Sequence, residues 1–248
     1  MSPRVWRPAA ASVLRRGEAV AFAGQLWHGA AMAELVLDVD ALLVGEPALL
    51  APGVMSAIGK TPREGTVRIT WLGLEGDSVA DPAVHGGPDK ALHLFPQEHY
   101  HLWRMPLGRH PLLERPGAFG ENLATRGAIE GMLCIGDRFA LGSARLEISQ
   151  GRQPCFKLNH RFGQADVLAR AVHTGRTGLY LRVIAEGEAR AGEPMTLIER
   201  SHPEWSVARA FDLLIAGGAA RDPAGVAALA RMDVLAESWR RRAEKLAR

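Results

Sequence analysis

Short apolar segments separated by glycine- and proline-rich turns fill most of this 248-residue chain. The segment of residues 66–72 alternates like a half-buried strand, with Val67, Ile69 and Trp71 on one face. Such short strands, with few helices between them, do not suit a regular βαβ array. The pattern therefore predicts a mostly β fold with some helix, built as an antiparallel barrel or sandwich. Further strands are predicted at residues 91–95, 138–141, 145–148, 179–185 and 195–198.

Helices are expected in two regions. Pro96 opens a predicted helix that runs through Trp103, since proline is tolerated in a first helical turn. Residues 203–248 have the pattern of three short amphipathic helices, and a group of this size must pack on the β body or on a partner. The expected starts of these three helices are Pro203, Asp222-Pro223 and Asp233, the last acting as a cap.

The formal net charge of the chain comes from its first 31 residues. Residues 1–31 hold four arginines against one glutamate, which accounts for the whole formal net charge of +3. The remainder is formally neutral, so the charge does not indicate a nucleic-acid-binding body. We expect residues 1–31 to be a disordered leader, with a targeting segment or a mis-called start as alternatives. A β domain at residues 32–200 and a helical subdomain at residues 203–248 follow.

Cysteine and hydropathy patterns bound the class of protein further. The chain has two cysteines, which cannot form a disulfide framework and suit a reducing, cytoplasmic compartment. No apolar run is long enough to span a bilayer, so no membrane role is expected.

Cys155 lies in the segment that most indicates chemistry. An apolar strand leads into it, and Gly151 and Pro154 are expected to break that strand, which places the thiol on a loop. Arg152 and Lys157 flank the cysteine, and nearby cations favour the thiolate, the form that attacks or binds metal. The alternative is a buried, inert thiol beside two solvated cations.

A second polar cluster lies around His85, which is followed by Gly86 and Gly87. Paired glycines let backbone N–H groups approach a ligand closely, and a histidine can transfer a proton near neutral pH. Asp77 and Asp81 precede it, but the spacing fits no standard zinc pattern, so capped turns are the preferred interpretation of the aspartates.

Other polar residues carry weaker signals. Asn122, in a glycine-bounded loop, either binds a polar ligand or caps the turn. Lys60, Arg152 and Lys157 supply enough positive charge for a phosphate-bearing ligand if they converge. The basic cluster at the end of the chain suits the dipole of the last helix, with a docking surface for an acidic partner as the alternative. That cluster comprises Arg240, Arg241, Arg242, Lys245 and Arg248.

Five separated segments, in this order, resemble the MOSC domain family and, within it, the 6-hydroxylaminopurine reductases of the YiiM type. Gly151 departs from the family pattern, in which a proline precedes the arginine, and this predicts a looser cysteine loop. The segments are Gly73-Leu74-Glu75-Gly76-Asp77, His85-Gly86-Gly87-Pro88-Asp89-Lys90-Ala91, Pro96-Gln97-Glu98-His99-Tyr100 with Trp103, Ala118-Phe119-Gly120-Glu121-Asn122-Leu123, and residues 149–159 around Cys155.

The resemblance implies a MOSC-type β-barrel with helical insertions that binds a molybdenum cofactor, a molybdenum–pterin with a terminal phosphate. Cys155 then corresponds to the thiolate ligand of molybdenum, and a soft thiolate suits a metal already bound by sulfur. Lys60 and Arg152 are expected to neutralise the phosphate and pterin. The Gly86-Gly87 backbone, Asn122, Ser149 and Gln150 are expected to hold the pterin edge.

The reaction that the resemblance implies is reduction of N-hydroxylated compounds to amine and water, with Cys155 and His85 as catalytic residues and His85 as proton donor. The sequence holds no iron–sulfur or dinucleotide motif, so a separate reductase is expected to supply electrons, docking on the helical tail. The resemblance also implies a role in detoxifying N-hydroxylated base analogues. Binding of pyridoxal phosphate is a further activity with which proteins of this kind could be described. The alternative function is a non-catalytic carrier of molybdenum cofactor, or of sulfur on Cys155.

Overall fold

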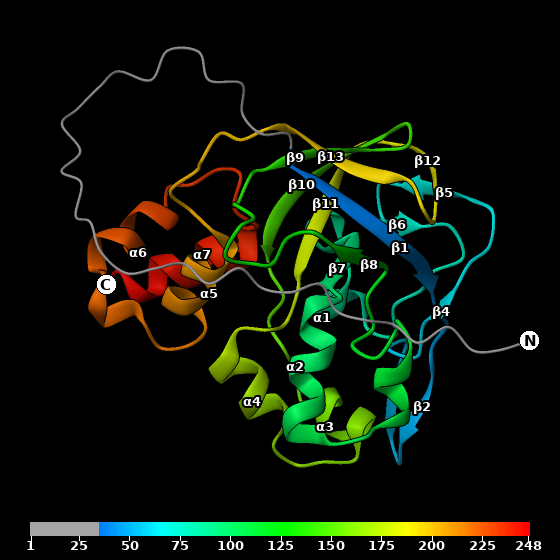
Figure 1. The fold of residues 1–248 in the computed structure, drawn as a ribbon. Helices are drawn as coiled ribbons and strands as arrows, with labels where there is room; N and C mark the ends of the chain where they lie inside the picture. Colours follow the sequence, from blue (N-terminus) through cyan, green and yellow to red (C-terminus); the bar gives the residue numbers. More distant parts are fainter. Residues whose placement is uncertain (1–34) are drawn as a thin grey trace, which may run out of the picture. The chain divides into compact units, whose positions relative to one another are not determined.

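Seven strands pair edge to edge until the last meets the first, which closes them into a barrel (Figure 1). The computed structural model describes residues 35–248, so the predicted leader of residues 1–31 lies outside the described residues. The order around the barrel is β13-β9-β10-β11-β7-β8-β1, with β1 pairing again with β13. These strands are β1 (Val36–Val44), β7 (Leu92–Pro96), β8 (Leu123–Arg126), β9 (Arg138–Leu141), β10 (Ala144–Gly151), β11 (Leu179–Ala185) and β13 (Pro194–Glu199).

All neighbouring barrel strands are antiparallel except β7 and β8, which are parallel and need the crossover that α2 supplies. The short strand β4 (Thr61–Pro62) pairs with β1. Two further sheets are separate from the barrel: β2 (Ala48–Ala51) pairs with β3 (Val54–Ser56), and β5 (Thr66–Thr70) pairs with both β6 (Gly73–Leu74) and β12 (Gly187–Arg190). The predicted mostly β fold with helical insertions is therefore confirmed, and the barrel is the correct one of its two expected forms.

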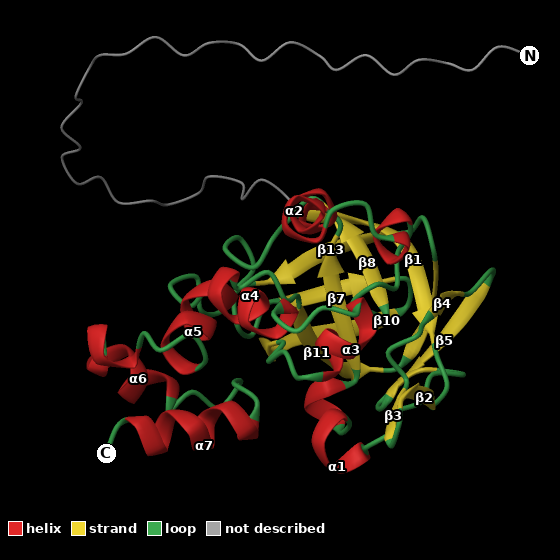
Figure 2. Cartoon of the chain, turned by 90° about the horizontal axis from the view of Figure 1, so that it is seen from below, coloured by secondary structure: helices red, strands yellow, loops and turns green. Residues whose placement is uncertain are grey.

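The helices form two groups around the barrel (Figures 1 and 2). One group lies at an end of the barrel and the other against its side. None of the helices among residues 35–248 is long and apolar enough to cross a membrane. The first group is α2 (Glu98–Leu107), α3 (Lys157–Phe162) and α4 (Val167–Thr174), and the second is α5 (Val207–Leu214), α6 (Pro223–Leu229) and α7 (Glu237–Leu246). A short α1 (Pro82–His85) and the 3-10 turns η1 (Pro88–Lys90), η2 (Pro111–Glu114) and η3 (Ala219–Arg221) lie in connections.

Two apolar clusters correspond to these two helix groups. The barrel interior continues into the α5–α7 group, so that Phe211 and Trp239 share one buried cluster with barrel residues such as Phe139. A second cluster lies under α2–α4, where the rings of Phe95 and Phe119 stack with centroids 4.3 Å apart. The C-terminal helices therefore obtain their stability by packing on the barrel, and residues 35–248 belong to one compact unit.

The sequence pattern predicted the strands better than the ends of the helices. The strands at residues 138–141 and 179–185 match β9 and β11 to the residue. Trp71 does not share the buried face of Val67 and Ile69, because β5 ends at Thr70 and the indole, 53% exposed, lies in the turn that follows. Predicted Asp222 does cap α6, where it accepts from Gly225 N at 2.8 Å.

Three predicted helix starts were wrong. The helix expected at Pro96 begins at Glu98, since Pro96 is still the last residue of β7. The helix expected at Pro203 begins at Val207, because Ser206 accepts from Arg209 N and is the actual cap. Asp233 caps nothing, since α7 begins four residues later at Glu237.

Gly151 is part of a strand and does not loosen the cysteine loop. It is the last residue of β10, it is buried, and it pairs with Leu179 of β11. A Cβ at this position would lie 2.9 Å from Trp239 Cη2 and 3.2 Å from Val207 Cγ1. The glycine therefore makes room for the helical group to pack against the strand that leads into the cysteine segment.

Replacing Gly151 with alanine tests this packing. We expect Gly151→Ala to lower the free energy of unfolding by about 1–3 kcal/mol, because Trp239 and its neighbours must shift. Urea unfolding followed by circular dichroism measures the change. Gly131→Ala is the matched control, since a Cβ at Gly131 meets no heavy atom within 4 Å. Equal stability of the two variants would show that the helices do not need the glycine.

Candidate functional site

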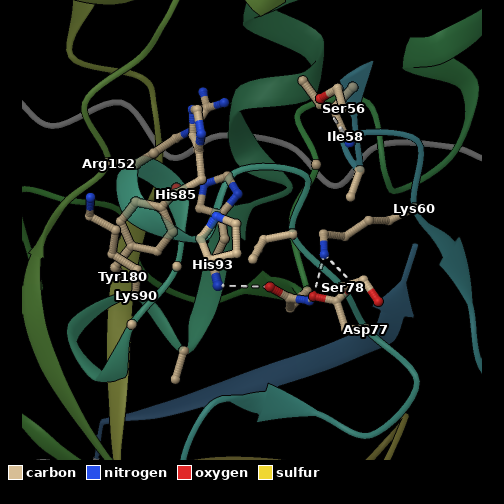
Figure 3. Close-up of a pocket in the computed structure, with 18 of the residues that line it drawn as sticks. Ser56, Ile58, Lys60, Asp77, Ser78, His85, Lys90, His93, Arg152 and Tyr180 are labelled. Atoms are coloured by element: carbon tan, nitrogen blue, oxygen red, sulfur yellow. Dashed lines mark hydrogen bonds and ion pairs between the residues drawn. The ribbon is translucent and has the colours of Figure 1, made fainter. Parts of the chain in front are cut away.

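A pocket of about 350 Å³ opens at the rim of the barrel and collects most of the residues that the sequence predicts (Figure 3). Arg152, His85 and Tyr180 lie on one side of it, and Lys60 and Asp77 lie on the other. The predicted site residues that line the pocket are Lys60, His85, Gly86, Gly87, Asn122, Arg152 and Cys155. Residues up to 95 positions apart in the sequence are thus brought to one place.

The floor of the pocket is a buried ion pair between Lys60 and Asp77, whose side chains are 7% and 10% exposed. The Asp77 carboxylate also accepts from Asn122 Nδ2 at 2.8 Å and from Gly45 N at 2.8 Å. Burial lowers the pKa of Lys60, and the charge of Asp77 acts against that shift. Asp77 is therefore an anchor for the lysine, which is more than the capped turn expected from the sequence.

Asn122 is engaged on several sides within the protein. Its Nδ2 also donates to Leu43 O at 3.1 Å, and its Oδ1 accepts from His93 N at 3.1 Å. The side chain therefore ties β1, β7 and Asp77 together. Both Nδ2 hydrogens are used in these bonds. Asn122 can therefore bond to a ligand only by accepting a second hydrogen bond at Oδ1.

Positive charge at the pocket comes from Lys157, as expected from the sequence, and from the more deeply buried Arg152. Arg152 is only 7% exposed, its backbone N donates to Gly178 O at 3.0 Å, and its Nη1 has no hydrogen-bond partner in the described part of the chain. A buried guanidinium group left partly unpaired is costly, and an anion in the pocket offsets that cost. Burial raises the pKa of the adjacent Tyr180 hydroxyl, while Arg152 acts in the opposite direction.

Two histidines border the pocket in their neutral forms. Complete burial, with the charge of Arg152 nearby, lowers the pKa of His93 to about 3, and its Nε2 contacts Thr177 O at 3.1 Å. Burial and the charge of Lys157 lower the pKa of His85, with Asp81 opposing and with Lys90 and Arg152 adding to the shift. The Nδ1 atom of His85 is buried and has no hydrogen-bond partner among the described residues. His85 therefore presents a neutral, partly unsatisfied imidazole at neutral pH.

Cys155 lies between the end of β10 and the start of α3, as the sequence predicted. Its thiol is free and partly exposed, in contrast to the buried Cys134. The chain reaches this position through Gln153 and Pro154, and Leu158 N donates to Cys155 O at 3.1 Å to begin the helix. Cys155 is therefore not the buried thiol of the alternative interpretation, whereas Cys134 is buried.

The glycines after His85 shape the pocket wall. Gly87 has φ of 98°, a backbone conformation that side chains other than glycine rarely adopt. A Cβ at Gly87 would meet no atom within 4 Å, so the backbone is open to an approaching ligand there. Gly86 N is already used, since it donates to Pro82 O at 3.2 Å.

Two predicted residues do not reach this pocket. The buried hydroxyl of Ser149 lies 2.5 Å from Asp89 O and 3.1 Å from Tyr180 O, which satisfies it within the protein. Gln150 is buried, with its Oε1 accepting from Ser238 Oγ at 3.1 Å, and it lines a different pocket on the α7 side. The pairing of β10 with β11 is irregular between Ile148 and Gln150, which changes the register at Ser149.

Glu130, which the sequence analysis did not identify, holds the backbone turn that contacts Arg152 and His93. The Glu130 carboxylate accepts from Gly178 N at 2.7 Å and Thr177 N at 3.2 Å, and its other oxygen lies 2.6 Å from His99 Nε2. It thereby fixes the turn whose carbonyls contact Arg152 and His93. A lone glutamate 22 residues before Arg152 gives no local signal of this function.

Comparison with known proteins agrees with this geometry. The sequence model of the MOSC domain family matches residues 81–196, which include His85, Arg152 and Cys155. The chain is 43% identical over 148 residues to Protein YiiM of Escherichia coli (strain K12), spanning 60% of this chain and 66% of that protein. It is 41% identical over 155 residues, 62% of the chain, to a protein of Gibberella moniliformis named Reductase, of which it spans 28%.

A solved structure, that of YiiM from Geobacillus stearothermophilus, superimposes with a TM-score of 0.71 and 31% identity, covering 86% of this chain and all of that one. The chain therefore belongs to the MOSC domain family, in the group that includes YiiM. The chain spans just under two thirds of the E. coli protein and 28% of the Gibberella protein. The activities of those whole proteins are therefore not assigned to this chain by similarity.

MOSC domains are associated with binding a molybdenum cofactor, and the residues of the pocket fit that group. The unpartnered Arg152 Nη1 suits an anionic part of the cofactor, and the partly exposed Cys155 thiol suits molybdenum. Lys60 contributes less net charge than the sequence suggested, because Asp77 pairs with it. Among the described residues no group of three or more His, Cys, Asp or Glu is arranged to hold a bare metal ion.

The buried ion pair of the floor gives a testable consequence. We expect Asp77→Asn to lower the free energy of unfolding by about 3–5 kcal/mol, because it leaves the Lys60 ammonium buried without its counter-ion. The double variant Asp77→Asn/Lys60→Met is expected to recover much of that loss, since it removes the orphaned charge. Urea denaturation of all three proteins measures this. A double variant no more stable than Asp77→Asn would show that the pair is not the source of the effect.

Proposed function

We propose that this protein is a molybdenum-cofactor-dependent reductase that converts N-hydroxylated compounds, such as 6-hydroxylaminopurine, to amine and water. The observation that carries the proposal is one pocket in which a partly exposed thiol, Cys155, accompanies a buried guanidinium with an unpartnered nitrogen, Arg152. The name of the Gibberella relative, Reductase, supports an oxidoreductase role. Membership of the MOSC family supports the choice of cofactor.

The cofactor, when bound, supplies the two-electron redox chemistry that breaking an N–O bond requires. Cys155 would hold the metal through its thiolate, and Arg152 would pair with an anionic group of the cofactor. The backbone at Gly87 leaves room for a flat ring to approach. Tyr180 and Lys90 complete the wall between this pocket and the second one.

Breaking the N–O bond to form water also requires protons, and His85 is the residue that we propose to deliver one. It lines both pockets, so its imidazole borders a molecule bound in either one. Because the pKa of His85 is lowered, its charged form is a minority at pH 7, and we expect mildly acidic conditions to favour the reaction.

We propose that electrons reach the pocket from another protein. The chain has two cysteines, one of which is the proposed metal ligand, so it cannot supply the four thiolates of an iron–sulfur cluster. A separate reductase as donor is therefore part of the proposal. Its docking on the helical tail remains a prediction.

Substitution of the two cysteines tests the reductase directly. Protein purified from a cofactor-producing host is expected to reduce 6-hydroxylaminopurine with an artificial electron donor. Cys155→Ser is expected to abolish the reduction, because oxygen is a poor substitute for a soft thiolate. Cys134→Ser, a change at a buried thiol outside both pockets, is the matched control and is expected to remain active.

Two results would overturn the reductase. If the Cys155→Ser variant is active, the thiolate is not required for the reaction. A wild-type protein that carries molybdenum but reduces no N-hydroxylated compound would also contradict it, and a persulfide on Cys155, detected by intact mass, would then support the carrier alternative.

A further inference from the structure

A second pocket of about 510 Å³ meets the first one at Cys155. His85, Lys90, Cys155 and Tyr180 line both pockets, so a molecule in the second pocket reaches the thiol and the imidazole directly. The volume is within the range of roughly 300–1,000 Å³ that is usual for small-molecule sites. The chemistry of this second pocket differs from that of the first, because α7 supplies a large part of its lining.

The α7 side of this pocket is strongly cationic. Arg241, Arg242 and Lys245 line it, and their spacing along α7 places them on neighbouring positions of one helix face. No aspartate or glutamate is among the described residues that line the pocket. Arg241 also pairs with Glu237 and Arg242 Nε donates to Leu214 O, whereas Lys245 forms no ion pair within residues 35–248.

The pocket has further polar groups in its wall. Ser238 Oγ donates to Gln150 Oε1 at 3.1 Å, which joins α7 to β10. Trp239 lines the pocket and is 2% exposed, yet its Nε1 has no hydrogen-bond partner in the described part of the chain. The wall thus places a hydroxyl and an indole beside the three cations that line the pocket.

We propose that this second pocket takes the substrate and that its cations select N-hydroxylated nucleotides over the free bases. The proposal rests on the proposed reductase function, and it names the substrate class. The N–OH group would lie at the Cys155 and His85 end, and a phosphate monoester would lie against the cations of α7. A phosphate carries about −1.5 to −2 charges at pH 7 and offers three acceptor oxygens, so it can pair with several cations at once.

The helix dipole alone does not account for this arrangement. It favours cations anywhere in the last turns of α7, whereas Arg241, Arg242 and Lys245 line the pocket and Arg240 does not. Arg240 instead lies 3.5 Å from Asp233 on the outer side. A concave pocket whose lining includes no carboxylate residue and that ends at a partly exposed thiol suits a small anion better than the convex surface of an acidic protein.

Equilibrium binding tests the phosphate preference without turnover. Adenosine 5′-monophosphate and adenosine, neither of which has an N–OH group, are titrated into the cofactor-loaded protein by calorimetry. We expect the monophosphate to bind about tenfold or more tightly than the nucleoside, because only it engages the α7 cations. Arg241→Gln/Lys245→Gln is expected to remove that difference, and Arg240→Gln, the matched control on the same helix, to preserve it.

A kinetic comparison separates this inference from the proposed function. The values of kcat/KM are measured for 6-hydroxylaminopurine riboside and for its 5′-monophosphate. The wild type is expected to favour the monophosphate, and the double variant is expected to lose that preference.

The outcomes are distinguishable. Equal affinity of the wild type for the nucleoside and its monophosphate overturns the inference even if the base is reduced. An equal loss with Arg240→Gln also overturns it, since general charge attraction would then suffice. A double variant that binds nucleotide normally but loses electron transfer from a protein donor would assign the cations to an acidic partner. If the protein binds the monophosphate preferentially but reduces no N-hydroxylated compound, the proposed reductase function is contradicted, while the second pocket is still supported as an anion-binding site.

Discussion

The buried carboxylate of Asp77 is the interaction on which the geometry of the site depends. It receives the Lys60 ammonium, the amide of Asn122 and the backbone N–H of Gly45, and these come from three separate stretches of the chain. Asn122 in turn bonds to β1 and β7 at Leu43 and His93. One carboxylate therefore fixes the floor against which the rest of the pocket is arranged.

This arrangement decides where free positive charge remains. Lys60 is balanced by Asp77, so the charge available to an anionic cofactor comes from other cations that line the pocket, among them Arg152 and Lys157. The cationic character then continues past Cys155 into the second pocket, where α7 supplies further basic side chains. The Trp239–Gly151 contact packs α7 against the strand that leads into the cysteine segment, so the helical group supports the site as well as the fold.

The sequence predicted those features that local pattern determines. Short apolar segments between turns predicted the bounds of β9 and β11, and the expected break of a strand near Pro154 predicted the position of Cys155 on a connection. The resemblance to a known family, rather than periodicity, brought Lys60, His85, Arg152 and Cys155 together before the structure did. Closure of β1 on β13 depends on pairing between residues about 160 positions apart, which no local window contains.

The predictions that did not hold depended on contacts distant in sequence. Gly151 suggested a loose loop, but the absence of a Cβ there leaves room for the ring of Trp239, which lies 88 residues away in the sequence. The resemblance implied that Ser149 holds the pterin edge, yet its hydroxyl bonds to the backbone of Asp89 and Tyr180. Asp77 looked like a turn cap because its lysine partner, 17 residues earlier, gives no signal in the pattern. Side-chain partners of this kind are fixed by the closed barrel and not by the sequence around each residue.

The measurement that tests the central claim most directly is the molybdenum and pterin content of wild-type protein beside Arg152→Gln, both purified from a cofactor-producing host. Metal is measured by mass spectrometry and pterin by the fluorescence of its oxidised form. If the pocket holds the cofactor through its buried guanidinium, the wild type contains molybdenum and pterin in near-equal amounts to protein, and Arg152→Gln loses both. A variant that is folded and as fully loaded as the wild type, or a wild type with neither component, would contradict the account.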